Sequence, residues 1–101
     1  MERALPISIP QSGLAEFCRR HRIKRLSLFG SVLGEDFTPQ SDVDVLVEFA
    51  PGAKVSLFDV GGMTVELEAM IQRRVDLRTP EDLSRYFRAR VLREAHLLYA
   101  A

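Results

Sequence analysis

An alternating stretch at residues 42–49 constrains the fold of this chain more than any other feature. Successive residues of a β-strand point to opposite faces of a sheet, so residues two apart share a face. One face of this stretch is apolar and consists of Val43, Val45, Val47 and Phe49. The other face consists of Asp42, Asp44, Leu46 and Glu48. The pattern predicts a half-buried strand whose apolar face the rest of the domain has to cover.

The sequence before and after this strand predicts two helices and one more strand. A helix over residues 10–21 places Leu14, Phe17 and Cys18 on one stripe. Residues 23–29 are typical of a short buried strand, and residues 32–41 of a connection with a single helical turn. A helix over residues 56–72 has a rough apolar phase, and a Gly pair inside it weakens it and could break it. The phase residues are Leu57, Val60, Leu67 and Ile71, and the pair is Gly61 and Gly62.

The last third of the chain predicts one strand and two helices. Residues 74–78 alternate, with Val75 and Leu77 on one face and Asp76 on the other. Residues 79–82 are typical of a helix start, with a Thr cap, a Pro and two acids. A final helix over residues 87–99 is expected to carry Val91, Leu92, Ala95 and Leu98. The complete order, α-β-β-α-β-α-α, indicates an α+β fold with a small mixed sheet covered by helices.

Length and composition bound the class of protein. The 101 residues are enough for a single domain, residues 1–101, with apolar surface left over for a homo-oligomer or another partner. The only cysteine, Cys18, excludes an intrachain disulfide and a Cys-based zinc site. No apolar run is long enough for a membrane span, and residues 1–10 lack a signal-peptide pattern, so a cytoplasmic location is expected. Zero net charge argues against a general nucleic-acid coating protein, so direct nucleic-acid binding is not expected.

The zero net charge conceals a segregation of charges along the chain. Apart from Arg3 and Lys54, every Lys and Arg lies in residues 19–25 or 73–93. Residues 26–72 contain eight acids and only one base. A fold that brings the basic blocks together would set an acidic centre beside basic walls, which suits a metal ion and a polyphosphate. Ordinary solvated helix faces would produce the same pattern, and charge alone does not separate the two interpretations.

Three carboxylates form a candidate metal site. Asp42 and Asp44 share a strand face and lie roughly 6.5–7 Å apart along the chain, so they can converge on a divalent cation. Asp76 is the natural third ligand because it too lies on an alternating strand. Such a trio can hold one or two ions, and two ions can activate an attacking oxygen and neutralise a leaving phosphate.

Gly30 and Ser31 form a candidate phosphate-binding turn. A glycine at a strand end lets backbone N–H groups approach a phosphate closely, and the serine hydroxyl adds a donor. Taken alone, a Gly-Ser pair is usually a simple turn and an Asp-x-Asp is usually a turn or cap. The two together, each beside an apolar strand, are much more specific.

Residues 28–31, a nine-residue gap, and residues 41–49 resemble the minimal nucleotidyltransferase family of the polymerase-beta-like superfamily. Residues 75–83 are similar to that family's third-carboxylate strand and the helix that follows. The resemblance covers roughly residues 23–95. It implies a nucleotidyltransferase, polymerase-beta palm-like fold, with Gly30 and Ser31 holding the triphosphate. It also implies that Asp42, Asp44 and Asp76 hold Mg²⁺.

The resemblance further implies a partner and a reaction. These small proteins are commonly antitoxins of a helical HEPN-domain ribonuclease toxin, and some are reported to adenylylate a tyrosine on that toxin. ATP is then the substrate and Mg²⁺ the cofactor. A partner would complete the acceptor site, because minimal members lack the substrate domains of larger relatives.

One position departs from the family pattern. Relatives commonly carry an Arg three residues after the motif Ser, where this chain has Gly34. Losing a cation there weakens phosphate binding or transition-state stabilisation unless another arginine compensates. Candidates for compensation are Arg78, Arg85 and Arg88. A tolerated loop variation is the alternative interpretation.

The remaining polar candidates have simpler interpretations. His21 and His96 lie in predicted helices with no ligand pattern around them, so structural roles are expected. Cys18 is expected in the core. Glu48 is either a solvated residue or, as the family implies, a residue near the site. Residues 97–101 are interpreted as a helix end or as a partner surface.

Three hypotheses for function follow. The first is an enzyme that transfers AMP from ATP to a protein hydroxyl. In it Asp42 and Asp44 hold the nucleotide metal, while Asp76 bridges a second ion and helps deprotonate the acceptor. The second is an antitoxin that acts by contact alone, with a weak or inactive site. The third is a metal or nucleotide sensor without transfer.

Overall fold

The structure is a computed structural model and describes residues 5–101. It contains one four-stranded sheet of strand order β3-β2-β1-β4, in which β1 is antiparallel to both neighbours and β2 is parallel to β3. In chain order the main elements are α1 (Gln11–Arg20), β1 (Ile23–Phe29), β2 (Val43–Phe49), α2 (Leu57–Ile71), β3 (Val75–Arg78), α3 (Arg88–Glu94) and β4 (His96–Ala100). Short 3-10 turns lie at η1 (Gly30–Leu33) and η2 (Pro80–Asp82). The mixed α+β architecture expected from the sequence is confirmed.

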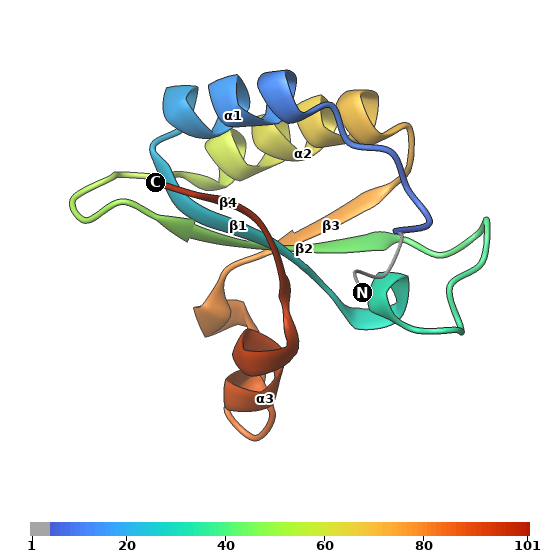
Figure 1. Cartoon of the computed structure of the whole chain (residues 1–101). Coiled ribbons are helices and arrows are strands. Elements are labelled where there is room, and N and C mark those ends of the chain that lie inside the picture. The colour runs from blue at the N-terminus through green and yellow to red at the C-terminus, as the bar shows by residue number, and fades with distance from the viewer. Residues whose placement is uncertain (1–4) are drawn as a thin grey trace.

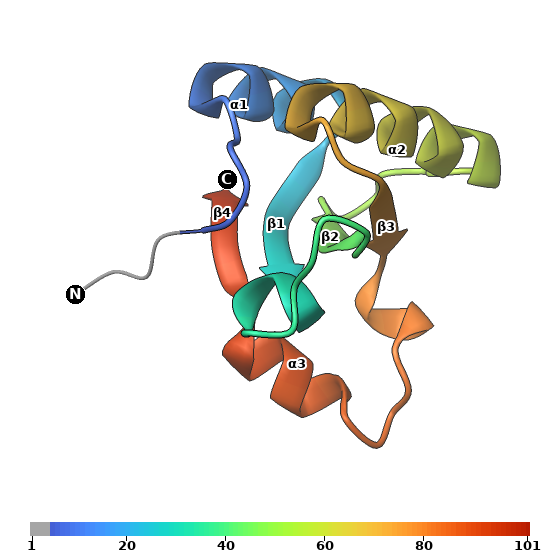
Figure 2. The ribbon, with the colours of Figure 1, turned by 90° about the vertical axis from the view of Figure 1, so that its right-hand side faces the viewer.

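The two faces of the sheet are covered differently. Helices α1 and α2 lie side by side over one face, whereas α3 projects from the opposite face (Figures 1 and 2). The core lies between the sheet and the two long helices. Its fully buried side chains include Phe17 and Cys18 from α1, Leu26 and Leu28 from β1, Val45 and Val47 from β2, and Met63 and Leu67 from α2.

The strand register fixes which residues share a face. Leu26 pairs with Val47 and Leu28 with Val45, so these apolar residues face the helices. The intervening pair, Ser27 and Leu46, faces the other way. Leu46 is nevertheless buried, and it lines a cavity on this face together with Leu92, Ala95 and Leu97. We call this second face, on the α3 side, the open face.

Five sequence predictions agree with the structure to within a residue or two. They are the helix over residues 10–21, the strands over 23–29, 42–49 and 74–78, and the helix over 56–72. Gly61 and Gly62 do not break α2, because Met63, Leu67 and Ile71 anchor it on the core. A reciprocal capping box between Ser56 and Asp59 starts this helix. The expected apolar phase is wrong at Leu57, which is 89% exposed.

The predicted final helix over residues 87–99 is wrong in its second half. The helix ends at Glu94, Ala95 adopts an extended conformation, and His96–Ala100 form the edge strand β4. This strand satisfies the free edge of β1, with Tyr99 opposite Leu26 and Leu97 opposite Ser27. Pairing with β1 therefore overrode a local helical pattern. His96 and residues 97–100 form a strand of the sheet, and Ala101 follows it, so none of them is a helix end.

The predicted helix start at residues 79–82 is also shorter than expected. Thr79 and Asp82 form the capping box, but only the 3-10 turn Pro80–Asp82 follows. Leu83 then becomes extended and buries its side chain, which ends the turn. The single turn expected within residues 32–41 forms earlier, at η1.

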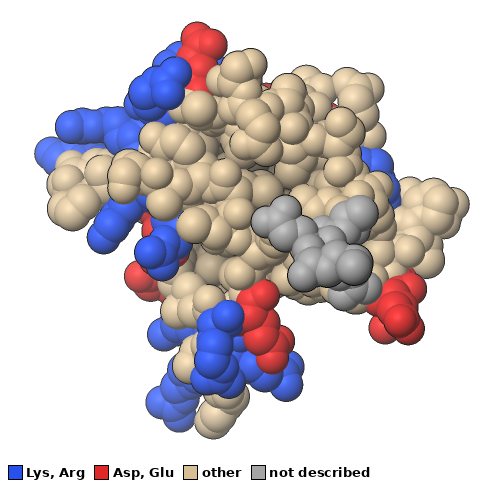
Figure 3. Space-filling model, in the orientation of Figure 1, with Lys and Arg blue, Asp and Glu red and all other residues tan. Residues whose placement is uncertain are grey.

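The two basic blocks do meet the acidic middle of the chain. Ion pairs join Arg20 to Glu66 at 2.9 Å, Arg74 to Asp42 at 3.2 Å and, more loosely, Arg25 to Glu48 at 4.0 Å. Other Lys and Arg side chains gather on the projecting segment that carries α3 (Figure 3).

None of the helices formed by residues 5–101 combines the length and the apolar character of a bilayer crossing. The expectation that residues 1–10 lack a signal peptide falls partly outside the described residues, because these begin at residue 5.

Candidate active site

The five predicted site residues meet at one end of the sheet. Phe29 at the end of β1 lies opposite Asp44, and Asp44 lies opposite Asp76 in the parallel ladder. Adjacent strands are about 4.8 Å apart, so the two carboxylates leave neighbouring strands on the same face. Gly30 and Ser31 directly follow Phe29, and Asp42 directly precedes β2. The fold thus juxtaposes the candidate phosphate turn and the candidate metal ligands.

Gly30 and Asp44 are in direct contact. Gly30 has a φ of +76°, a backbone conformation that residues other than glycine rarely adopt. A Cβ atom at this position would overlap the Oδ2 atom of Asp44 and lie 3.2 Å from its Cγ atom. Glycine is therefore required here both by the backbone and by the carboxylate that lies against it.

Asp44 is the central carboxylate of the group. Burial raises the pKa of Asp44 above its ordinary value, the nearby charges of Asp76 and Asp42 raise it further, and Arg78 opposes them. The three aspartates therefore lie within electrostatic reach of one another. A divalent cation at this position would relieve both the desolvation and the repulsion.

The flanking aspartates pair with arginines. Asp42 lies 3.2 Å from the Nε atom of Arg74, and Asp76 lies 3.2 Å from that of Arg78. Within residues 5–101, no three His, Cys, Asp or Glu side chains are gathered tightly enough to hold a metal ion as they stand. The donor set nevertheless fits Mg²⁺, because all three groups are carboxylates and both flanking ones are half exposed.

Two arginines that sequence reasoning missed hold the loop in front of Asp42. Arg73 donates from Nη2 to the carbonyls of Thr38 and Ser41, each at 2.8 Å, and stacks over Phe37. Arg74 donates to the carbonyl of Gln40. The only sequence signal was their place in the second basic block, and nothing local linked them to residues more than 30 positions away.

A cavity of about 450 Å³ opens beside Gly30. One wall is formed by Phe29, Gly30, Leu33 and Gly34, and the other by Arg90, Val91, Glu94 and Ala95 of α3 and its end. Gly34 is exposed and extended, and a Cβ there would meet only the Ser31 carbonyl, at 3.7 Å. The position that departs from the family pattern thus borders the candidate nucleotide site.

The three arginines considered as replacements have other contacts. Arg78 pairs with Asp76, and Arg85 stacks on Tyr86. Arg88 donates to the carbonyls of Pro80, Glu81 and Leu83 and so anchors the segment before α3.

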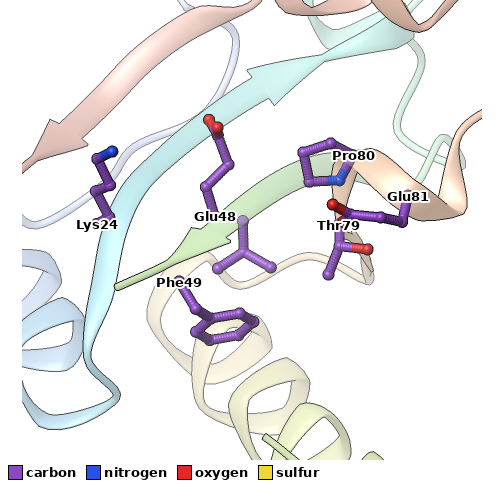
Figure 4. A pocket seen from close by; sticks show the side chains of 7 residues that line it. Lys24, Glu48, Phe49, Thr79, Pro80 and Glu81 are labelled. Carbon is purple, nitrogen blue, oxygen red and sulfur yellow. The ribbon is translucent and has the colours of Figure 1, made fainter. Parts of the chain in front are cut away.

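Glu48 lies further along the open face, in a second cavity of about 340 Å³. Figure 4 shows its side chain between Lys24 on one side and Thr79, Pro80 and Glu81 on the other. Glu48 is four residues beyond Asp44, or about 13 Å along a strand, so it does not touch the aspartates.

His21 stacks on Phe17 and contacts Glu66, and Cys18 is buried, which confirms the structural roles expected for both.

Comparison with known proteins assigns the chain to a family. The pattern of the nucleotidyltransferase domain matches residues 12–99. The chain belongs to the nucleotidyltransferase family. Nucleotide transfer is therefore its reaction class, as the resemblance of residues 28–31 and 41–49 implied.

Individual relatives agree with the assignment. A protein of Methanocaldococcus jannaschii named "Putative protein adenylyltransferase" is 37% identical over 76 residues, which cover 75% of this chain and 80% of the relative. A solved "putative minimal nucleotidyltransferase" is 34% identical, with a TM-score of 0.69 over 84% of this chain and 85% of that one. The nucleotidyltransferase fold also matches a solved complex described as tri-AMPylated Shewanella oneidensis HEPN toxin with MNT antitoxin. That match has 18% identity and a TM-score of 0.62, over 90% of this chain and 70% of that one.

Proposed function

We propose that this nucleotidyltransferase transfers AMP from ATP to a tyrosine hydroxyl of a HEPN-domain toxin, with Mg²⁺ as cofactor, and so acts as an antitoxin. The observation that carries the proposal is the row Gly30, Asp44 and Asp76 at one end of the sheet. A relative named as a protein adenylyltransferase supports the reaction, and a fold neighbour solved with an AMPylated HEPN toxin supports the acceptor.

In the proposed reaction the acceptor oxygen attacks the α-phosphorus of ATP. A new P–O bond forms to the acceptor, the bond from the α-phosphorus to the bridging oxygen breaks, and pyrophosphate leaves. The hydroxyl proton passes to the Asp76 carboxylate or to solvent. When bound, Mg²⁺ would neutralise the phosphate charge and acidify the acceptor hydroxyl.

The side chains have distinct proposed roles. The backbone N–H groups at Gly30 and the Ser31 hydroxyl hold the β- and γ-phosphates, which the left-handed conformation of Gly30 permits. Asp42 and Asp44 hold the nucleotide's metal ion, and Asp76 holds the second ion and faces the acceptor. Positioning and charge neutralisation provide the rate, without a covalent enzyme intermediate.

Intact mass measurement tests the proposal directly. The protein is incubated with the product of the adjacent reading frame, ATP and Mg²⁺, and each chain is weighed. We expect one or more AMP units on the partner and none when the protein carries Asp42→Ala and Asp44→Ala. No gain with any nucleoside triphosphate would contradict the proposed transfer.

Asp76→Asn separates the two roles of the carboxylates. We expect it to abolish transfer while ATP binding persists, because Asp42 and Asp44 remain. Asp36→Asn is the matched control, since Asp36 is an exposed loop carboxylate on the same chain. Transfer at the normal rate by Asp76→Asn would remove Asp76 from the mechanism.

An antitoxin that acts by contact alone is the second candidate. Gly34 favours it, because this position borders the nucleotide cavity and lacks the cation of relatives. In that case the Asp42→Ala/Asp44→Ala protein would still neutralise the toxin and still form a stable complex. Rescue of growth by the double variant, scored beside the mass measurement, separates the two candidates.

A further inference from the structure

The cavity beside Gly30 brings the cation of Arg90 to the candidate phosphate turn. Its two walls come from opposite ends of the sequence, the turn after β1 and the helix α3. Among the described residues that line it, Arg90 is the only basic one. Gly30 and Gly34 contribute only backbone to the first wall, beside the apolar side chains of Phe29 and Leu33, so none of the described side chains of this wall is charged.

Arg90 is available for a ligand. Within residues 5–101 its guanidinium forms no hydrogen bond or ion pair with another side chain or carbonyl. This distinguishes it from Arg78, Arg85 and Arg88, each of which already has a partner. Arg93, on the same helix, is equally unpaired but does not line the cavity.

We infer that Arg90 binds the triphosphate of the nucleotide from the α3 side of the cavity, opposite the backbone of Gly30 and Ser31. This inference rests on the nucleotide transfer proposed above. A guanidinium can make paired, charge-assisted hydrogen bonds to phosphate oxygens, which a glycine-lined wall cannot supply. Arg90 is then a binding residue that belongs to neither sequence motif, and α3 becomes one side of the nucleotide site.

Glu94 lines the same cavity one helical turn after Arg90. Its carboxylate repels a phosphate, and the spacing of four residues places it on the same helix face as Arg90. The inference therefore predicts that Glu94→Gln tightens nucleotide binding by about twofold, the scale of one exposed charge. Weaker binding by Glu94→Gln would contradict an anion in this cavity.

Calorimetric titration of the full chain with AMP-PNP and with AMP, both with Mg²⁺, tests the inference. We expect Arg90→Ala to weaken AMP-PNP binding by about 10- to 100-fold and AMP binding much less, because a charge-assisted contact to the outer phosphates is lost. Arg93→Ala is the matched control and should stay within about twofold of the wild type. An equal loss for both ligands, or equal values for Arg90→Ala and Arg93→Ala, would overturn the assignment.

A rescue variant guards against an indirect effect. Position 34 has room for a side chain, so Gly34→Arg in the Arg90→Ala protein supplies a cation from the other wall. We expect this pair to regain most of the AMP-PNP affinity. Failure of the rescue, with unfolding curves equal to wild type, would show that the cavity does not hold the triphosphate.

The same series separates this inference from the proposed function. A wild-type protein that transfers AMP with the same KM for ATP as Arg90→Ala overturns the role of Arg90 alone. A wild-type protein that binds no nucleotide overturns both. A wild-type protein that binds AMP-PNP through Arg90 but transfers nothing overturns only the transfer.

Discussion

The face of the sheet under α1 and α2 and the open face differ in what their side chains contact. On the covered face Leu26, Leu28, Val45 and Val47 are fully buried against the helices. On the open face the same two inner strands carry Ser27, Leu46 and Asp44, and β3 adds Asp76 and Arg78. Successive residues of one strand therefore lie in different environments, one in the apolar core and the next on the open face.

This difference separates stability from chemistry within single strands. Burial of apolar side chains on the covered face supplies the free energy of folding. The open face instead holds Asp44, whose burial and whose repulsion by Asp76 and Asp42 work against the folded state. Such an arrangement is expected where a site is selected for ligand binding rather than for stability.

The largest expected effect is the loss of activity in Asp44→Asn. We expect transfer to fall by about 10³-fold or more, because the variant removes the charge of a carboxylate that we propose as a metal ligand. The free energy of unfolding should stay equal or rise, because the variant removes a destabilising charge. Transfer rates and denaturant unfolding on the same samples test both halves, with Asp36→Asn as control. A variant that is both active and unstable would reverse the comparison.

The converse experiment is Leu26→Ala on the covered face. We expect it to lower the free energy of unfolding by about 2–5 kcal/mol, because it opens a cavity in a fully buried cluster. Leu97→Ala is the matched control on the open face, where this side chain is 51% exposed, and should cost about 1 kcal/mol or less. Equal losses in chemical denaturation would show that both faces support the fold alike.

Gly30 combines a left-handed backbone conformation with a close contact to Asp44, so its substitution should affect both stability and activity. We expect Gly30→Ala to cost about 1–3 kcal/mol of stability, because alanine is strained at a φ of +76°. Activity should fall as well, since the new Cβ displaces the Asp44 carboxylate. Gly34→Ala is the control, because its backbone is extended and a Cβ there would make only an ordinary van der Waals contact, and it should change stability by less than about 0.5 kcal/mol. A neutral Gly30→Ala would contradict the close packing of these two residues.

Local sequence patterns predicted the central strand, the first helix and the position of the aspartates. These features depend on residues close in sequence, such as the alternation in β2 and the stripe of Leu14, Phe17 and Cys18. The strand β4 depends instead on the free edge of β1, some 70 residues earlier, so a local helical pattern at residues 95–99 misled the prediction.

The candidate site shows the same division. The motifs indicated Gly30, Ser31, Asp42, Asp44 and Asp76, and the sheet register brings them to one end of the sheet. The sequence did not indicate Arg73 and Arg74, which hold the loop before Asp42, or Arg90 across the cavity. Each of these acts through contacts that only the packing of distant segments creates.

The smallest expected effect is a pH dependence that isolates Asp44. The pKa of Asp44 is raised in the folded protein, mainly by burial, so between its unfolded and folded pKa values the folded state binds more protons. The free energy of unfolding of the wild type therefore decreases as pH rises through this window. That of Asp44→Asn does not, because the variant lacks the titrating carboxyl group. Subtracting the two unfolding free energies from pH 3 upward should give a difference that favours the variant increasingly and then levels off.

The subtraction matters because other carboxylates titrate nearby with the opposite sign. Hydrogen bonds from Ser56, Arg20 and Thr79 lower the pKa values of Asp59, Glu66 and Asp82, respectively, so both proteins lose this stability on acidification. These contributions cancel in the difference, which leaves the term from Asp44. Saturating Mg²⁺ should then stabilise the wild type more than Asp44→Asn and shrink the gap, because a bound cation compensates the buried charge. If the difference in unfolding free energy between the two proteins changes with neither pH nor Mg²⁺, then burial and neighbouring charges do not raise the pKa of Asp44 on the open face.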